Sequence, residues 1–341
     1  MSSRISSQQS SSTRMNSVSV VTALVAFVLA AVSQARSGQI PLGHHDPSVG
    51  IKLESIPLLG FGTWNLKISE QNTHIDCAKI YGNQKEVGKG IHDGLKRGGV
   101  KRSEVWITSK LWNDRHDPDQ VEKGLDDTLY ELNLQYLDLY LMHWPVASDG
   151  GMTYESYIKT WKAMTNLLST GKTRHIGISN FSPHQLKELL KSSPHRPSVH
   201  QMEMHPYLPQ TDWLNFHDDN DIHVTAYSPL GNANPTYKDK KASSPDSIPP
   251  LLENPEVEEI AERRNCTTAQ VALKWGIGRK TSVIPKSSHL SRIQENFGAQ
   301  QCRLEDEDLK LLGRVGRKYL HRFNNPSKSY GVPLFQDLED A

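Results

Sequence analysis

The chain has 341 residues, with 39 basic and 38 acidic side chains and a formal net charge of +1. A chain with charges this evenly balanced has no net positive charge to attract nucleic acid, so nothing favours nucleic acid as a partner. The length suits one barrel domain preceded by a leader. Cys77, Cys266 and Cys302 lie far apart without CxxC or Cys/His spacing. We therefore expect neither a zinc site nor a disulfide framework.

The first 35 residues differ in composition from the rest of the chain. Residues 1–14 are rich in Ser and Gln and cannot form a core. Residues 18–32 are an uncharged apolar run, and Ser33-Gln34-Ala35 has the small-residue pattern of a cleavage site. We interpret residues 1–35 as a secretory signal; the alternatives are an uncleaved membrane anchor or an extension from a wrong start site. Residues 36–50 then form a linker, and residues 51–341 form the folded domain.

From residue 56 onward, short apolar runs alternate with amphipathic helical patterns. Helix starts are indicated by proline after a capping residue, as at Asp117-Pro118, Ser182-Pro183 and Asn254-Pro255. No GxGxxG follows a strand, which disfavours a Rossmann domain. Alternating strands and helices predict a parallel (β/α)8 TIM barrel. We expect its strands at residues 58–62, 74–78, 105–110, 137–144, 174–180, 199–204, 223–230 and 282–285.

The connection between the first two expected strands is unusually short. Only residues 65–72 separate Trp64 from Thr73, whereas a parallel crossover with its helix needs at least about 10 to 12 residues. We therefore expect this barrel to lack the helix between strands one and two, either because a piece of coding sequence is skipped or because the barrel is degraded. Apolar surface left bare on strand one would then favour aggregation, so the chain as written should be poorly soluble or inactive.

Three successive strand ends carry polar side chains that suit catalysis. Asp76 ends the second expected strand and Tyr81 follows it, Lys110 ends the third strand, and His143 ends the fourth. In a parallel barrel the carboxyl ends of the strands form the face where chemistry is assembled. We therefore expect these four side chains to meet at one end of the barrel.

The segments around these residues, HIDCA (74–78), ITSKLW (107–112) and HWP (143–145), resemble those of the aldo-keto reductases. That resemblance implies a catalytic tetrad of Asp76, Tyr81, Lys110 and His143. Tyrosine is a poor acid near neutrality, with an unperturbed pKa of about 10. We expect the Lys110 ammonium to lower the pKa of Tyr81, and Asp76 to hold that ammonium in place.

Further segments resemble the cofactor-binding motifs of the same family. They are GISNF (177–181), the glutamine of VHQME (199–203), AYSPLG (226–231), IPKS (284–287) and Arg292 with Glu295-Asn296. The resemblance implies NADPH/NADP+ as cofactor, because two cations near a helix start suit its 2′-phosphate. The implied cofactor-binding residues are Thr63, Ser179, Asn180, Gln201, Tyr227, Ser228, Leu230, Lys286, Ser287, Arg292, Glu295 and Asn296.

The expected substrate pocket is apolar, with Trp64, Trp112 and Trp144 at strand ends. Trp112 could equally serve only to pack the core. We expect residues 231–250 to form a mobile loop over the cofactor and residues 322–341 to close the substrate side.

The resulting hypothesis is an NADPH-dependent reductase of small aldehydes or sugars, with Tyr81 as proton donor. The alternative is a non-catalytic NADP-binding barrel that regulates a partner, or an inactive truncated isoform. We expect a monomer that binds a small-molecule carbonyl substrate and meets a membrane only if the leader is an uncleaved anchor.

The leader and the cofactor point to different compartments. The leader favours the secretory pathway, whereas NADPH is regenerated only inside the cell, so a cytoplasmic location is the alternative. Two N-x-S/T sequons, at Asn180 and Asn265, bear on this question. Because Asn180 is also an expected cofactor residue, we expect active protein to carry no glycan there.

Overall fold

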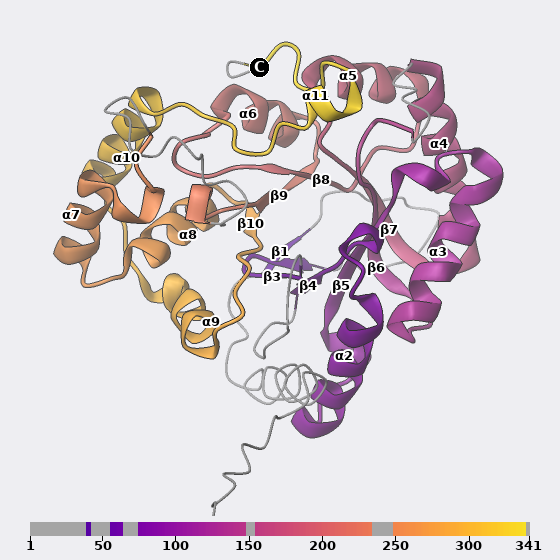
Figure 1. Ribbon diagram of the computed structural model, residues 1–341, viewed down its shortest axis with the longest axis horizontal. Helices are drawn as coiled ribbons and strands as arrows, with labels where there is room; N and C mark the ends of the chain where they lie inside the picture. Colours follow the sequence, from indigo (N-terminus) through magenta and orange to yellow (C-terminus); the bar gives the residue numbers. More distant parts are fainter. Residues whose placement is uncertain (1–38, 42–54, 64–73, 148–153, 234–247, 339–341) are drawn as a thin grey trace, which may run out of the picture.

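The computed structural model describes residues 39–41, 55–63, 74–147, 154–233 and 248–338 (Figure 1). Its centre is an eight-stranded sheet in which every neighbouring pair is parallel, in the order β10-β9-β8-β7-β6-β5-β4-β3. The strands are β3 (Phe61–Gly62), β4 (His74–Asp76), β5 (Trp106–Leu111), β6 (Leu137–Met142), β7 (Thr173–Ser179), β8 (Val199–Glu203), β9 (His223–Tyr227) and β10 (Ser282–Val283).

Backbone contacts close this sheet into a barrel. Leu59 forms a parallel bridge with Val283, the Gly60 amide donates to the Val283 carbonyl at 2.7 Å, and the Val283 amide donates to the Leu58 carbonyl at 2.8 Å. Gly60 has no room for a side chain, since an added Cβ would lie 2.6 Å from the His74 ring. The predicted parallel barrel is thereby confirmed.

Helices surround the strands as an outer layer (Figure 1). Capping side chains begin several of them where the sequence predicts: Asp117 accepts from the Asp119 amide, Ser182 from the Gln185 amide, and Asn254 from the Glu256 and Val257 amides. The helices are α2 (Gln84–Gly98), α3 (Pro118–Leu132), α4 (Tyr154–Asn166), α5 (Pro183–Ser192), α6 (Thr211–Asp219), α7 (Pro255–Arg264), α8 (Thr268–Gly278), α9 (Leu290–Phe297), α10 (Asp306–Lys318) and α11 (Ser327–Tyr330).

An additional strand pair closes the amino end of the barrel, which is the end where the strands begin. β1 (Gln39–Pro41) and β2 (Ser55–Pro57) pair antiparallel. The fully buried Ile56 of β2 packs with Trp106, Leu139, Leu141 and Val199, side chains of β5, β6 and β8. The inside of the barrel is therefore filled rather than open.

Several expectations differ from the structure in their bounds. β9 ends at Tyr227 rather than at residue 230 because Ser228 adopts a left-handed backbone, with φ of 48°. The expected missing helix falls on residues 64–73, and the leader on residues 1–35; both lie outside the described residues. Within the described residues, no helix has the length and apolar character needed to cross a membrane.

The cysteine expectation was wrong. Cys266 and Cys302 form a disulfide, with their Cα atoms 5.9 Å apart across a sequence separation of 36 residues. Cys77 is free and buried. Sequence spacing carried no sign of this pair because the fold, rather than a local motif, brings the turn after α7 beside the segment that precedes α10.

Candidate active site

The carboxyl ends of β4, β5 and β6 bring the four predicted catalytic residues together. Asp76 is the last residue of β4, Lys110 lies near the end of β5, and His143 follows β6. Tyr81 ends the short 3-10 helix η2 (Lys79–Tyr81), in the turn that leaves β4. The parallel register, with Asp76 opposite Thr108 and Leu111 opposite Met142, places these residues at the same end of the barrel.

Lys110 is the hub of this group. Its ammonium donates to Asp76 Oδ1 at 2.5 Å, to the Cys77 carbonyl at 2.8 Å and to the Tyr81 hydroxyl at 3.3 Å. Lys110 is fully buried, so its charge survives only because these oxygens surround it. The second Asp76 oxygen accepts from the Gln201 amide at 2.7 Å, which fixes the carboxylate from the other side.

The titration behaviour of Tyr81 differs from the expectation. Burial raises the pKa of Tyr81 to about 12, although the nearby Lys110 charge acts to lower it. Burial also acts to lower the pKa of Lys110, but Asp76 and Tyr81 raise it more, so that pKa lies above its ordinary value. At neutral pH the pair therefore consists of a protonated phenol beside an ammonium. Lys110 acts on the pKa of Tyr81 in the expected direction, but desolvation outweighs it, so the net pKa is raised rather than lowered.

His143 faces Tyr81 from the end of β6. The two rings meet edge to face, with centroids 6.0 Å apart. Burial and the charge of Lys110 hold the pKa of His143 well below 6.5. The imidazole is therefore neutral and carries a single N–H donor. Its Nδ1 has no hydrogen-bond partner among the described residues.

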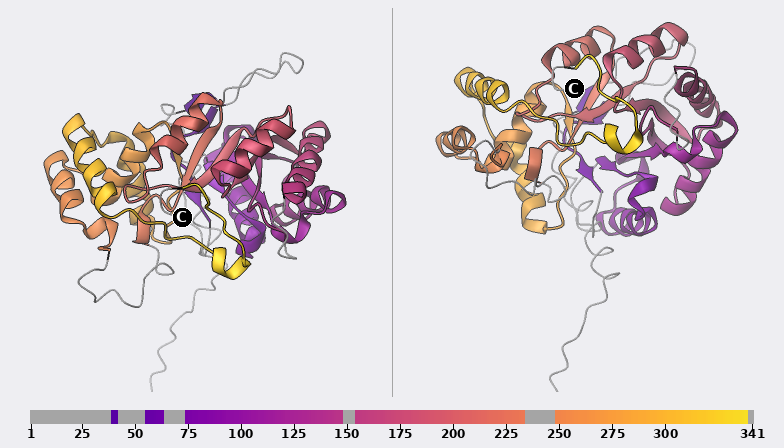
Figure 2. Two further views of the ribbon diagram at one scale, coloured as in Figure 1. Left: turned by 90° about the horizontal axis from the view of Figure 1, so that it is seen from above. Right: turned by 45° about the horizontal axis from the view of Figure 1, so that its top comes forward.

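Aromatic side chains wall this polar group. Trp112 meets His143 edge to face at 5.2 Å, and Trp144 stacks with it at 6.2 Å. Trp144 is buried against Leu334 and Phe335 of the carboxyl-terminal segment, which crosses one end of the barrel in yellow (Figure 2). Trp112 contacts both His143 and this cluster, so it lies between the predicted tetrad and the carboxyl-terminal segment. Trp64 lies outside the described residues.

The predicted nicotinamide-binding side chains adjoin the tetrad. Ser179, Asn180 and Gln201 are buried at the ends of β7 and β8. The Asn180 amide donates to the His143 carbonyl at 2.9 Å and to the Ser179 hydroxyl at 3.0 Å. A hydroxyl and two side-chain amides can pair with both the carbonyl and the amino group of a carboxamide. This donor and acceptor set fits the nicotinamide end of NADPH.

Tyr227, at the end of β9, connects this group to the carboxyl-terminal segment. Its hydroxyl donates to Asn180 Oδ1 at 2.7 Å and accepts from the Asn324 amide at 3.1 Å. The fully buried Glu203 accepts from the Phe323 and Asn324 backbone amides, each at 2.8 Å. Sequence reasoning missed Glu203 and Asn324. A glutamate at the end of a strand expected to lie inside the barrel was the available signal, since a carboxylate buried there needs hydrogen-bond partners.

The remaining predicted cofactor residues lie around the turns after β9 and β10. Ser228 and Gly231 shape the turn that contains Leu230, where the Gly231 amide donates to the Ser228 carbonyl at 2.9 Å. After β10, Lys286 and Arg292 are exposed, whereas Ser287 and Asn296 are buried. Two exposed cations at the start of α9 suit a phosphate.

Two further predicted cofactor residues, Thr63 and Glu295, also make intramolecular hydrogen bonds. The Thr63 hydroxyl donates to the Asp76 carbonyl at 2.8 Å. The Glu295 carbonyl accepts from the Gln270 amide at 2.9 Å, which ties α9 to α8. Within the described part of the chain, no cluster of three or more His, Cys, Asp or Glu side chains could hold a metal ion.

Comparison with known proteins agrees with this geometry. The family model described as "Aldo/keto reductase family" matches residues 68–316. An uncharacterized oxidoreductase of Schizosaccharomyces pombe is 43% identical over 312 residues, covering 84% of this chain and 92% of that protein. The aldose reductase structure from Giardia lamblia has a TM-score of 0.72 at 32% identity, covering 82% of this chain and 98% of that one. A Bombyx mori aldo-keto reductase structure in complex with NADP has a TM-score of 0.77 at 28% identity, covering 89% and 100%. The chain therefore belongs to the aldo/keto reductase family and is an NADP-dependent oxidoreductase that reduces carbonyl groups.

Proposed function

We propose that this protein reduces small aldehydes or sugars to alcohols, with Tyr81 donating the proton to the carbonyl oxygen. The observation that supports this most strongly is the buried Lys110 ammonium, which contacts both Asp76 and the Tyr81 hydroxyl. Bound NADPH supplies the hydride, with Ser179, Asn180 and Gln201 holding its carboxamide. The protein's remaining task is to deliver one proton and to stabilise the charge that is left.

The charges in the site favour reduction over the reverse reaction. Because the pKa of Tyr81 is raised to about 12, the phenol keeps its proton at neutral pH. When the proton leaves, the phenolate lies beside Lys110, whose charge is held by Asp76. Alcohol oxidation needs the deprotonated phenol, so it should become appreciable only at alkaline pH.

Neighbouring side chains position the substrate. The neutral His143 can donate one hydrogen bond to the carbonyl oxygen, which orients the carbonyl toward Tyr81. Trp112 and Trp144 present apolar surface next to this point and exclude water. The pocket therefore suits an aldehyde with a small apolar or sugar-like body.

A substrate panel tests this proposal. Because β3 and β4 pair within the closed barrel despite the short connection between them, we expect the purified chain to be active, contrary to the expectation drawn from that connection alone. It should oxidise NADPH when given an aromatic aldehyde, an aliphatic aldehyde or an aldose, and should use NADH less well. A ketone-free, aldehyde-free reaction is the control for slow cofactor decay. NADPH binding seen by fluorescence, without turnover of any carbonyl in the panel, would instead favour the non-catalytic barrel.

A further inference from the structure

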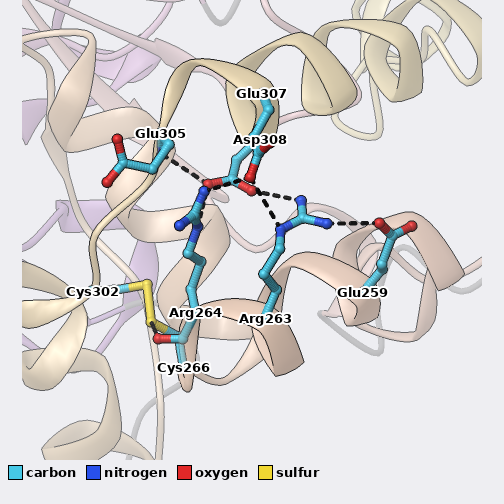
Figure 3. Close-up of polar contacts among 8 residues, drawn as sticks. All are labelled: Glu259, Arg263, Arg264, Cys266, Cys302, Glu305, Glu307 and Asp308. Atoms are coloured by element: carbon cyan, nitrogen blue, oxygen red, sulfur yellow. Dashed lines mark hydrogen bonds and ion pairs between the residues drawn. A yellow bond between two sulfur atoms is a disulfide. The ribbon is translucent and has the colours of Figure 1, made fainter.

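One corner of the molecule, where α7 meets α8 and α10, is fastened by a covalent bond and by ion pairs (Figure 3). The Cys266–Cys302 disulfide joins the turn after α7 to the segment that leads into α10. Next to it, Arg264 Nε lies 2.6 Å from Asp308 Oδ2, and Arg263 Nη2 lies 2.7 Å from Asp308 Oδ1. The turn between α7 and α8 is thus fixed from two sides.

That turn, Asn265-Cys266-Thr267, is one of the two N-x-S/T sequons in the chain. Asn265 adopts a left-handed backbone with φ of 52°, and its backbone amide, not its side chain, caps α7 by donating to the Ala261 and Glu262 carbonyls. Its side chain is exposed, and so is that of Thr267, which caps α8. A bulky group on the side-chain amide of Asn265 would therefore point into solvent. It would leave the backbone cap of α7 and the Thr267 cap of α8 in place.

The other sequon has the opposite environment. Asn180 is 2% exposed, and both ends of its amide are engaged, with Nδ2 donating to the His143 carbonyl and Oδ1 accepting from Tyr227. Ser182, its hydroxyl residue, is also buried and caps α5. A sugar on Asn180 cannot be accommodated in this fold, so protein that has folded can carry a glycan at only one of the two sequons, Asn265.

We propose that Asn265 is an N-glycan acceptor, and that the glycosylated chain carries the Cys266–Cys302 disulfide. Both features belong to the same compartment, because disulfides form and persist in the oxidising secretory pathway. The leader interpreted above as a secretory signal agrees with this. The proposal concerns modification and location, and it is independent of the reductase function.

The chemistry balances with donors of that compartment. The Asn265 amide nitrogen forms a bond to the anomeric carbon of a lipid-linked pyrophosphate oligosaccharide; the sugar–phosphate bond breaks, and the amide proton leaves with the lipid pyrophosphate. The two thiols become a disulfide by exchange with a disulfide-carrying oxidoreductase, which leaves as the dithiol. Cys302 follows Cys266 by 36 residues. The sequon therefore emerges from synthesis before its cysteine can pair, and glycan transfer comes first.

Expression of the full chain, leader included, in eukaryotic cells tests the proposal when the protein from both the cells and the medium is purified and peptide-mapped. The unreduced digest should contain the Cys266–Cys302 linked peptide with a glycan on Asn265, and glycosidase treatment should cause one mobility step. Asn265→Asp, which keeps the side-chain shape and tolerates a left-handed backbone, should remove that step. Thr267→Ser, which keeps both the sequon and the cap, should retain it.

Three results would overturn the proposal. Unmodified Asn265 on disulfide-linked protein would show that the exposed turn is not an acceptor. Unmodified Asn265 on protein with free thiols would show that the chain does not enter the oxidising compartment. A glycan on Asn180 of folded protein would contradict the burial on which the choice between the sequons depends.

Discussion

A buried carboxylate pairs with basic side chains at each end of the barrel, and the two ends differ in chemistry. At the amino end, Arg102 Nη2 lies 2.7 Å from Asp138 Oδ2, and Arg174 Nη1 lies 3.3 Å from Asp138 Oδ1. At the carboxyl end, Lys110 Nζ lies 2.5 Å from Asp76 Oδ1. Both pairs neutralise a buried carboxylate. At each end a cation also donates to a tyrosine hydroxyl, Arg174 Nη2 to Tyr136 at 3.1 Å at the amino end and Lys110 Nζ to Tyr81 at 3.3 Å at the carboxyl end. Of these two tyrosines, Tyr81 is the one that faces His143.

The choice of cation explains the difference. Arginine keeps its charge at any physiological pH and fixes its partner with a planar fork of donors, and the Tyr136 ring lies 4.1 Å from Arg102 and 4.3 Å from Arg174. This packing holds the strands in register. Lysine is a compact ammonium whose remaining donors reach the Tyr81 hydroxyl. We infer that the buried arginine–carboxylate pair serves stability at one end of the barrel, whereas the buried lysine–carboxylate pair serves the proposed proton transfer at the other.

Removing the carboxyl-end cation should have the largest effect. In Lys110→Met the phenol loses its charged neighbour and Asp76 becomes an unpaired buried carboxylate. We expect kcat/KM for aldehyde reduction to fall roughly 10²- to 10⁴-fold. Lys172→Met, which breaks a partly exposed pairing with Glu122 and Asp126, is the control and should retain activity. Retention of more than a tenth of wild-type activity by Lys110→Met would separate this lysine from catalysis.

Removing a cation at the amino end should lower the free energy of unfolding but leave kcat unchanged. Arg102→Met leaves Asp138 with Arg174 as its remaining cation, and we expect the free energy of unfolding to fall by about 3 kcal/mol. Arg115→Met breaks the exposed pair with Asp127 and should cost at most about 1 kcal/mol. Urea unfolding measures both. If folded Arg102→Met also loses most of its kcat, the division between the two ends does not hold.

Removing a cation expected to bind the cofactor should have a smaller effect, which weakens the binding of NADPH but not that of NADH. Arg292→Ala should weaken NADPH binding by roughly 1.5 to 3 kcal/mol, about tenfold to a hundredfold, while NADH binding changes little. Arg303→Ala, which removes another exposed arginine, is the control. Equal weakening of both cofactors in a fluorescence titration would show that Arg292 does not contact the 2′-phosphate.

Lowering the pH should gradually reduce the free energy of unfolding, through buried histidines at the amino end of the barrel. Burial lowers the pKa of His74 to about 4, and burial together with the His74 charge lowers that of His223 to about 3. Below pH 6.5 the unfolded chain binds protons that the folded chain does not, so stability falls as pH falls toward these values. Between pH 7 and 6 each such histidine should contribute less than about 1 kcal/mol. His223→Gln should reduce this pH slope, whereas His184→Gln, on the surface, should leave it unchanged.

The sequence alone predicted the barrel and the meeting of the four side chains proposed for catalysis. Alternating apolar strands and amphipathic helices indicate the fold, and a parallel barrel necessarily gathers Asp76, Lys110 and His143 at one end. Helix starts such as Asp117-Pro118 were equally visible because capping is a local interaction.

Features that depend on three-dimensional burial could not be predicted. The pKa of Tyr81 is set by desolvation against the charge of Lys110, and only the folded environment decides which is larger. The Cys266–Cys302 bond joins residues 36 positions apart with no local pattern. The link from Tyr227 through Asn324 to the carboxyl-terminal segment likewise depends on where that segment crosses the barrel.

The central claim is that Tyr81 donates the proton at the carboxyl end of the barrel. Single-turnover NADPH oxidation with an aldehyde, measured for Tyr81→Phe and for Tyr130→Phe, tests it most directly, because Tyr130 is 82% exposed on α3. Tyr81→Phe should bind NADPH with nearly unchanged affinity and lose roughly 10²- to 10⁴-fold in rate, while Tyr130→Phe matches the wild type. Comparable single-turnover rates for Tyr81→Phe and the wild type would contradict the account.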